Sequence, residues 1–78
     1  MHSSTAHAQL DLRGIPCPLS FVKAKLHLEK MPVGDRLEIW LDQGEPTEQV
    51  PDSLSMAGHK ILDLIPQADY FVLLVERA

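Results

Sequence analysis

The sequence predicts an α+β fold of two layers, in which a four-stranded mixed sheet carries two helices on one face. Segments with strand-like alternation and segments with helical spacing follow one another in the order β-α-β-α-β-β. The chain has 78 residues, which is enough for one domain with a single core. Helices that connect neighbouring strands cross the sheet with a fixed hand, so both helices are expected on the same side.

The first strand is predicted at residues 8–12, where apolar and polar side chains alternate. The small, polar residues before it predict a disordered tail over residues 1–8, followed by one domain over residues 9–78. Gly14 and Pro16 mark a turn after the strand. Together these features predict a strand and a tight loop that leads into the first helix.

The first helix is predicted at residues 18–31, which lack glycine and contain proline only at the first helical position. Pro32 and Gly34 follow it and predict its end. Its spacing predicts an amphipathic helix with a wide apolar face. That face is expected to be centred on Leu19, Val22 and Leu26, with Phe21, Ala24 and Leu28 beside it.

Residues 36–41 predict a second strand that directs Leu37, Ile39 and Leu41 into the core, so Trp40 is expected on the opposite face of the sheet. Residues 42–46 are interpreted as a loop. A second helix is predicted from Pro51 to Ala57, with Gly58 as the left-handed residue after it. A single longer helix to Ile65 is the alternative. The preferred interpretation places strands at residues 60–65 and 70–76.

Composition limits the classes of function. The net charge of −4 disfavours nucleic-acid binding. We also expect no aromatic platform on the sheet on which RNA bases could stack. No apolar run approaches the length of a membrane span, and residues 1–9 lack a signal-peptide pattern. The single cysteine excludes an internal disulfide and a multi-cysteine metal site. We therefore expect a cytoplasmic protein with no metal and no organic cofactor.

Cys17 is the candidate reactive residue because it directly precedes the first predicted helix. The positive end of a helix favours the thiolate, which is the nucleophilic form of cysteine. The alternative is a small buried side chain. Gly14, Pro16 and Pro18 are expected to shape the backbone around the sulfur. Arg13 is expected either to stabilise an anion there or to be a solvated loop residue.

Two other polar residues are expected to have structural roles. Asp11 is predicted to cap the turn or pair locally. His59 would complete a nucleophile–base pair with Cys17 only if the two were within hydrogen-bond reach. The second helix is expected to run antiparallel or nearly so to the first, and the sequence does not place His59 within hydrogen-bond reach of Cys17. A structural or surface role is therefore favoured for His59.

The segment Leu-Asp-Leu-Arg-Gly-Ile-Pro-Cys-Pro, residues 10–18, resembles the signature of the TusA/SirA/YedF family of small sulfur-carrier proteins. The resemblance continues through Gly34, Val50-Pro51 and Gly58-His59 and covers about residues 9–76. It implies a two-layer sandwich similar to the C-terminal domain of translation initiation factor three. It also implies that Cys17 accepts sulfane sulfur as a persulfide and passes it to a partner protein.

The resemblance implies a sulfur donor, such as a cysteine desulfurase or a rhodanese, and an acceptor protein, in a pathway such as tRNA thiolation or sulfur oxidation. We expect a monomer or a weak dimer, because an edge strand stays exposed. Ser20 replaces the second proline of the family's C-P-x-P pattern, and Gln43-Gly44 replaces a common Asp-Pro. These departures leave open an alternative, a non-catalytic regulatory or interaction module of the same fold.

Overall fold

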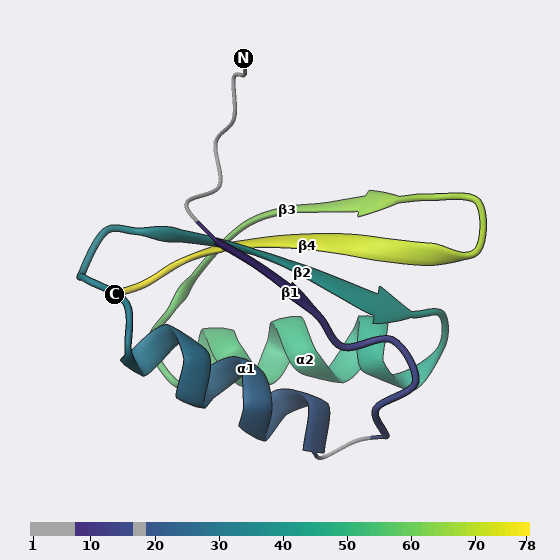
Figure 1. Cartoon of the computed structure of the whole chain (residues 1–78), viewed down its shortest axis with the longest axis horizontal. Helices are drawn as coiled ribbons and strands as arrows, with labels where there is room; N and C mark the ends of the chain where they lie inside the picture. Colours follow the sequence, from purple (N-terminus) through teal and green to yellow (C-terminus); the bar gives the residue numbers. More distant parts are fainter. Residues whose placement is uncertain (1–7, 17–18) are drawn as a thin grey trace.

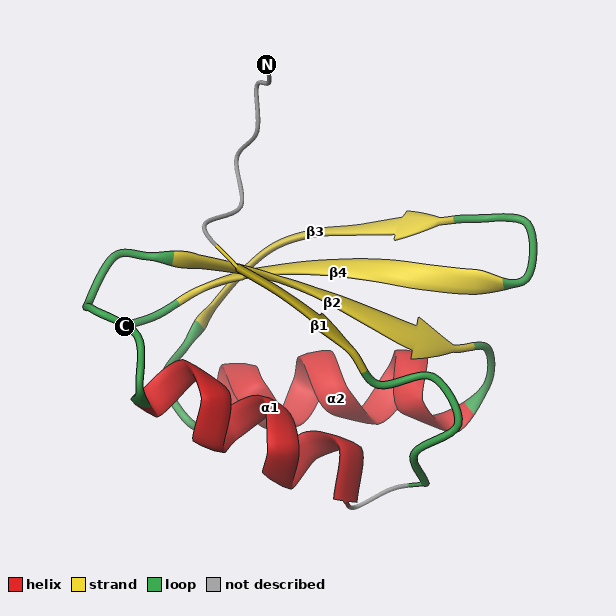
Figure 2. Ribbon diagram, in the orientation of Figure 1, coloured by secondary structure: helices red, strands yellow, loops and turns green. Residues whose placement is uncertain are grey.

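The computed structural model describes residues 8–16 and 19–78, which form a four-stranded sheet with two helices packed on one face (Figures 1 and 2). This architecture confirms the predicted fold class. Residues 1–7 of the predicted tail lie outside the described residues, as do Cys17 and Pro18. Ala8, which is predicted both in the tail and in the first strand, belongs to the strand. The elements are β1 (Ala8–Asp11), α1 (Leu19–Glu29), β2 (Arg36–Asp42), α2 (Glu45–Met56), β3 (Lys60–Pro66) and β4 (Tyr70–Glu76).

The strands lie in the order β1-β2-β4-β3. β1 pairs with β2 in parallel, and β4 runs antiparallel to both of its neighbours, β2 and β3. β1, β2 and β3 therefore share one direction, and each helix returns the chain from the end of one of these strands to the start of the next. The two helices consequently run parallel to each other (Figure 1). The expected antiparallel arrangement is wrong, because both helices connect strands of the same direction.

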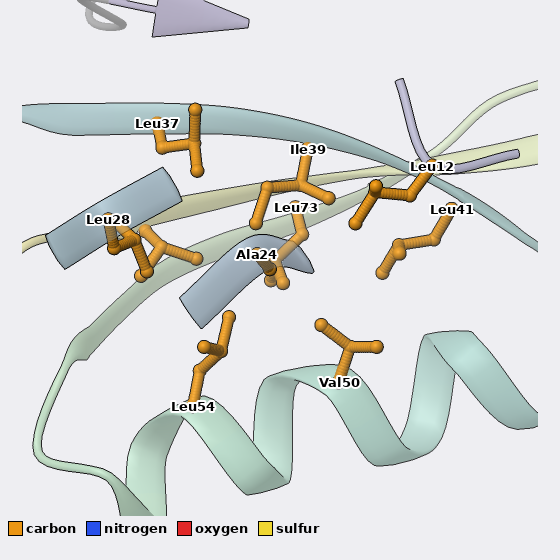
Figure 3. Packing of buried hydrophobic residues seen from close by; sticks show 10 residues of the cluster. Leu12, Ala24, Leu28, Leu37, Ile39, Leu41, Val50, Leu54 and Leu73 are labelled. Carbon is orange, nitrogen blue, oxygen red and sulfur yellow. The ribbon is translucent and has the colours of Figure 1, made fainter. Parts of the chain in front are cut away.

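The core lies between the inner face of the sheet and the two helices (Figure 3). Leu37, Ile39 and Leu41 of β2 are fully buried, as their alternation predicts. Each fully buried aliphatic side chain of this kind contributes about 1.5–3 kcal/mol. They pack with buried residues from the other elements, namely Leu12, Ala24, Leu28, Val50, Leu54, Leu73 and Val75.

α1 packs with only part of the predicted apolar face: Ala24 and Leu28 are buried as expected, but the residues at the centre of that face are not. Its buried residues are Ser20, Ala24 and Leu28, which recur every fourth residue along one side of the helix. Leu19 and Leu26 of the predicted face are exposed instead. Apolar residues lie on nearly every side of this helix, so spacing alone does not select one face. Small side chains at two of the buried positions are consistent with a close approach of the helix backbone to the core.

α2 begins at Glu45, six residues before the predicted start. Gly44 precedes it with a φ of +99°, and Pro46 occupies its first turn, where a proline is tolerated. Pro51 lies inside the helix and does not begin it. The predicted loop at residues 42–46 was wrong because either proline can mark a helix start, and only the packed structure distinguishes them.

The end of α2 agrees with the prediction. Gly58 has a φ of +100°, and its N–H donates to the carbonyl oxygen of Ser55 at 3.0 Å. The N–H of His59 donates to the carbonyl oxygen of Leu54, also at 3.0 Å. This pair of bonds is a Schellman motif, which ends a helix at a left-handed glycine. The alternative of one helix through residue 65 is therefore wrong, and β3 follows instead.

Candidate functional site

The loop from Leu12 to Pro16 leads from the end of β1 to Cys17. The N–H of Leu12 donates to the carbonyl oxygen of Trp40 at 2.9 Å and so continues the pairing of β1 with β2. The N–H of Ile15 donates back to the carbonyl oxygen of Leu12 at 3.1 Å and closes a turn. Gly14 has a φ of +82° within this turn, a conformation that other residues adopt at a cost. The backbone of the loop is thus fixed against the sheet.

Asp42 anchors the same loop from the neighbouring strand. Its Oδ2 accepts a hydrogen bond from the N–H of Gly14 at 2.6 Å. Its backbone oxygen accepts a second bond, from Oγ1 of Thr47 at 2.7 Å, in the first turn of α2. Sequence reasoning missed this residue. The available signal was a carboxylate at the end of a strand parallel to β1, since the carboxyl ends of adjacent parallel strands lie at one edge of a sheet.

The two loops at this edge enclose an open depression of about 600 Å³. One side is formed by residues 14–16, and the other by residues from the end of β2 and the start of α2, which are Asp42, Gln43, Glu45 and Pro46. Oε2 of Glu45 accepts a hydrogen bond from Nε2 of Gln49 at 3.2 Å. The depression therefore adjoins Cys17 in the chain and carries two carboxylates.

The residues that flank Cys17 and Pro18 are tied to each other. The N–H of Ser20 donates to the carbonyl oxygen of Pro16 at 3.1 Å, which is the i to i−4 pattern of an α-helix. A proline at position 20 would lack this N–H. The side chain of Ser20 is also buried in the core. The departure from the C-P-x-P pattern therefore changes both the backbone bonding and the packing of the first helical turn.

Arg13 lies against the open face of the sheet, which the helices do not cover. Its guanidinium carbon is 5.0 Å from the ring centroid of Trp40 and 4.8 Å from that of Tyr70. The guanidinium also forms an ion pair with Asp11 at 2.9 Å. The hydrogen bonds from Arg13 lower the pKa of Asp11. Asp11 thus pairs locally, as predicted, and an anion-stabilising role of Arg13 toward Cys17 stays a prediction.

The open face carries aromatic residues that the sequence analysis did not expect as a group. The rings of Trp40 and Tyr70 have centroids 5.9 Å apart and planes inclined by 47°. Nε1 of Trp40 donates to Oε2 of Glu38 at 2.6 Å. The expected lack of an aromatic platform is therefore wrong, because β2 and β4 are adjacent and their register brings these two rings together.

His59 lies at the opposite end of the domain from the Cys17 loop, where α2 leads into β3 (Figure 1). Its Nδ1 accepts a hydrogen bond from the N–H of Ala78 at 3.3 Å. This contact gives His59 the structural role that the sequence analysis favoured. The parallel direction of the two helices explains the separation, since the end of α2 and the start of α1 fall at opposite edges of the helix layer.

Residues 8–16 and 19–78 contain no group of three or more His, Cys, Asp or Glu side chains that could hold a metal ion. Within the same residues, no helix is long and apolar enough to cross a membrane.

Comparison with known proteins identifies the family. The family model for sulfurtransferase TusA matches residues 8–77. A candidate sulfur carrier protein of Thermotoga maritima is 36% identical over 55 residues, which are 70% of this chain and 70% of that protein. A candidate sulfur carrier protein of Archaeoglobus fulgidus is 37% identical over 59 residues, covering 76% of this chain and 67% of that protein.

The fold agrees with the same assignment. The crystal structure of a SirA-like protein from Desulfitobacterium hafniense superposes with a TM-score of 0.74 at 17% sequence identity. The match covers 88% of this chain and 95% of the other. The family model spans nearly the whole chain and includes the loop built from Gly14 and Asp42, so the chain belongs to the sulfurtransferase TusA family.

Proposed function

We propose that the protein is a sulfur carrier that accepts sulfane sulfur on Cys17 as a persulfide and passes it to a partner protein. The observation that carries this proposal is the fixed loop ahead of Cys17. Gly14 is bonded to Asp42, and Pro16 is bonded to Ser20 on the other side of the cysteine. Membership of the TusA family supports the same chemistry.

The proposed transfer is an exchange between a thiolate and a persulfide. The Cys17 thiolate attacks the outer sulfur of a donor persulfide, R–S–SH. The S–S bond of the donor breaks, and its electron pair leaves with the inner sulfur as the donor thiolate. Cys17 then holds S–SH, and the acceptor removes the outer sulfur by the same reaction. One S–S bond forms as one breaks, so the exchange needs no external oxidant or reductant.

The residues around Cys17 have separate parts in this proposal. Pro18 and the start of α1 at Leu19 follow it directly, and a helix N-terminus favours the thiolate. Gly14 and Pro16 set the path of the backbone. Arg13 takes part in anion stabilisation only when its guanidinium leaves the ion pair with Asp11 at 2.9 Å. The donor is a cysteine desulfurase or a rhodanese, and the lone thiol suits the reducing cytoplasm.

The test is sulfur uptake from inorganic polysulfide, followed by mass spectrometry of the intact protein. We expect the wild-type chain to gain the mass of one sulfur atom, which reductant removes, and the Cys17→Ser variant to gain none. A matched control moves the thiol by combining Cys17→Ser with Ser55→Cys, at an exposed position near the end of α2. Uptake there should be much slower, because a helix C-terminus disfavours an anion.

Two results would contradict the proposal. Uptake by the Cys17→Ser variant would show that another group holds the sulfur. Uptake by the relocated thiol at the wild-type rate would show that the Cys17 loop contributes nothing. A wild-type chain that takes up no sulfur would favour the interaction module of the same fold.

A further inference from the structure

The outer face of α1 exposes a row of large apolar side chains. Leu19, Val22 and Leu26 are 46%, 41% and 51% exposed. We name these three residues the α1 stripe. They follow the i, i+3, i+7 spacing of one helix face and lie opposite the buried row that contains Ala24 and Leu28. The stripe starts two residues after Cys17 and extends along the helix. A contiguous exposed apolar row of this kind is typical of a contact surface.

Positive charge flanks the α1 stripe. Lys23 and Lys30 are exposed: Lys23 stands one helical turn after Leu19, and Lys30 lies in the turn that directly follows α1. Lys25 belongs to the other flank, where its Nζ forms an ion pair with Glu29 at 2.9 Å. The net charge of the whole chain is −4, so this basic surface opposes the overall charge. α2 shows the reverse pattern, with Glu45, Glu48 and Asp52 and no lysine or arginine.

We infer that the α1 stripe, with Lys23 and Lys30, is the docking surface for the sulfur-donor protein, whose matching surface is apolar and rimmed by carboxylates. This inference rests on the proposed function. A donor has to bring its persulfide to Cys17, so its footprint includes the start of α1 at Leu19. The stripe continues that footprint along the helix with apolar contact area. The two lysines steer an acidic rim, as charge complementarity does in transient complexes.

The experiment compares two ways of loading Cys17. One donor is a protein, either a rhodanese charged from thiosulfate or a cysteine desulfurase supplied with cysteine, whichever loads the wild-type chain faster. The other is inorganic polysulfide, which needs no docking. The test variants are Val22→Ser, Leu26→Ser and Lys23→Glu. The matched controls are Met56→Ser, at an apolar residue 83% exposed near the end of α2, and Lys60→Glu, at an exposed lysine on β3.

We expect each of the three test variants to load from the protein donor about tenfold more slowly, the effect of losing one well-placed contact. Loading from polysulfide should stay at the wild-type rate, and the two controls should match wild type with both donors. Added salt should slow protein-donor loading of wild type, and Lys23→Glu should weaken that salt dependence, because screening acts on the steering charges.

Three outcomes would overturn the docking surface. If the stripe variants load from the protein donor at the wild-type rate, the α1 stripe does not contribute to donor binding. Equal losses with both donors would show damage to the Cys17 site instead of lost docking. A wild-type dimer that Leu26→Ser dissociates in sedimentation would assign the stripe to a second copy. Failure of the proposed function is distinguishable from these, because polysulfide would then fail to load wild-type Cys17.

Discussion

The N–H of Gly14 and the carboxylate of Asp42 form the bond that joins the Cys17 loop to β2. They are separated by 28 positions in the chain, and their donor–acceptor distance is 2.6 Å. A hydrogen bond to a charged acceptor contributes about 1.5–3 kcal/mol when shielded, and the exposure of this one reduces that to about 1 kcal/mol. The bond therefore adds modest stability and, in our proposal, holds the loop in one conformation.

Replacing Asp42 separates these two effects. We expect Asp42→Ala to lower the free energy of unfolding by about 1 kcal/mol and to slow sulfur uptake from polysulfide. Asp42→Asn should reduce the free energy of unfolding and the rate of sulfur uptake by smaller amounts, because its amide oxygen still accepts a hydrogen bond from the N–H of Gly14. Urea denaturation and intact-mass kinetics measure the two quantities. Asp52→Ala, at an exposed acid on α2, is the control, and equal behaviour of Asp42→Ala and Asp52→Ala would refute the role of Asp42.

Gly14 tests the conformation of the same loop. A Cβ added to it would meet no atom within 4 Å, so a substitution is strained only by the φ of +82°. We expect Gly14→Ala to lower the free energy of unfolding by about 1–2 kcal/mol, the cost of a left-handed conformation. Gly14→Asn should cost less, because asparagine tolerates this region. Equal stability of the alanine variant and wild type in urea denaturation would show that the turn relaxes freely.

At the scale of elements, α1 has two apolar faces, and only one is packed. Leu28 is fully buried, whereas Leu26, two residues earlier on the opposite side, is 51% exposed. The packed side carries Ser20 and Ala24, whose small side chains contribute little area but are fully buried. The larger side chains of the α1 stripe stay in solvent, where they are available for the docking that we infer.

The two leucines give a matched test of this orientation. Leu28→Ala should destabilise the protein by about 2–5 kcal/mol, because it removes buried methyl groups and leaves a cavity. Leu26→Ala should change the stability by about 0.5 kcal/mol or less, as surface substitutions do. Urea denaturation measures both. A larger loss for Leu26→Ala would show that the predicted face, and not the observed one, contacts the sheet.

For the whole molecule, the C-terminal residues connect parts that are distant in sequence. The N–H of Gly34 donates to the carbonyl oxygen of Arg77 at 2.9 Å. The N–H of Arg77 donates in turn to the carbonyl oxygen of Asp35 at 2.8 Å. The N–H of Ala78 reaches Nδ1 of His59 at 3.3 Å. The end of the chain is therefore attached both to the turn before β2 and to the start of β3.

These contacts make stability depend on pH. Burial lowers the pKa of His59 below its usual value of 6.5, and the charges of Arg77 and Lys25 lower it further, against an opposing effect of Glu29. Between the lowered pKa and 6.5, the unfolded chain binds more protons at this site than the folded chain does. The contribution of His59 to stability is therefore complete above 6.5 and is lost as the pH falls toward the folded pKa.

We expect wild type to lose more stability than His59→Gln when the pH is lowered from about 7.5 to about 5.5, the range in which an unperturbed histidine titrates. Thermal unfolding at both pH values measures the difference, and groups common to both proteins cancel from it. Equal losses in the two proteins would contradict the coupling of His59 to folding.

The sequence by itself determined the order of the elements, the inner face of β2 and the end of α2 at Gly58. Each of these depends on near neighbours in the chain, through the alternation of a strand or the conformational freedom of one glycine. The segment around Cys17 also pointed to the sulfur-carrier family, because its spacing is a local pattern.

Only the tertiary structure decided which side of α1 is packed, where α2 begins, and that Asp42 holds Gly14. Apolar residues surround α1, two prolines compete for the start of α2, and the bond between Asp42 and Gly14 joins neighbouring strands. These features depend on contacts between residues that are distant in the sequence, and the local spacing of residues does not specify such contacts.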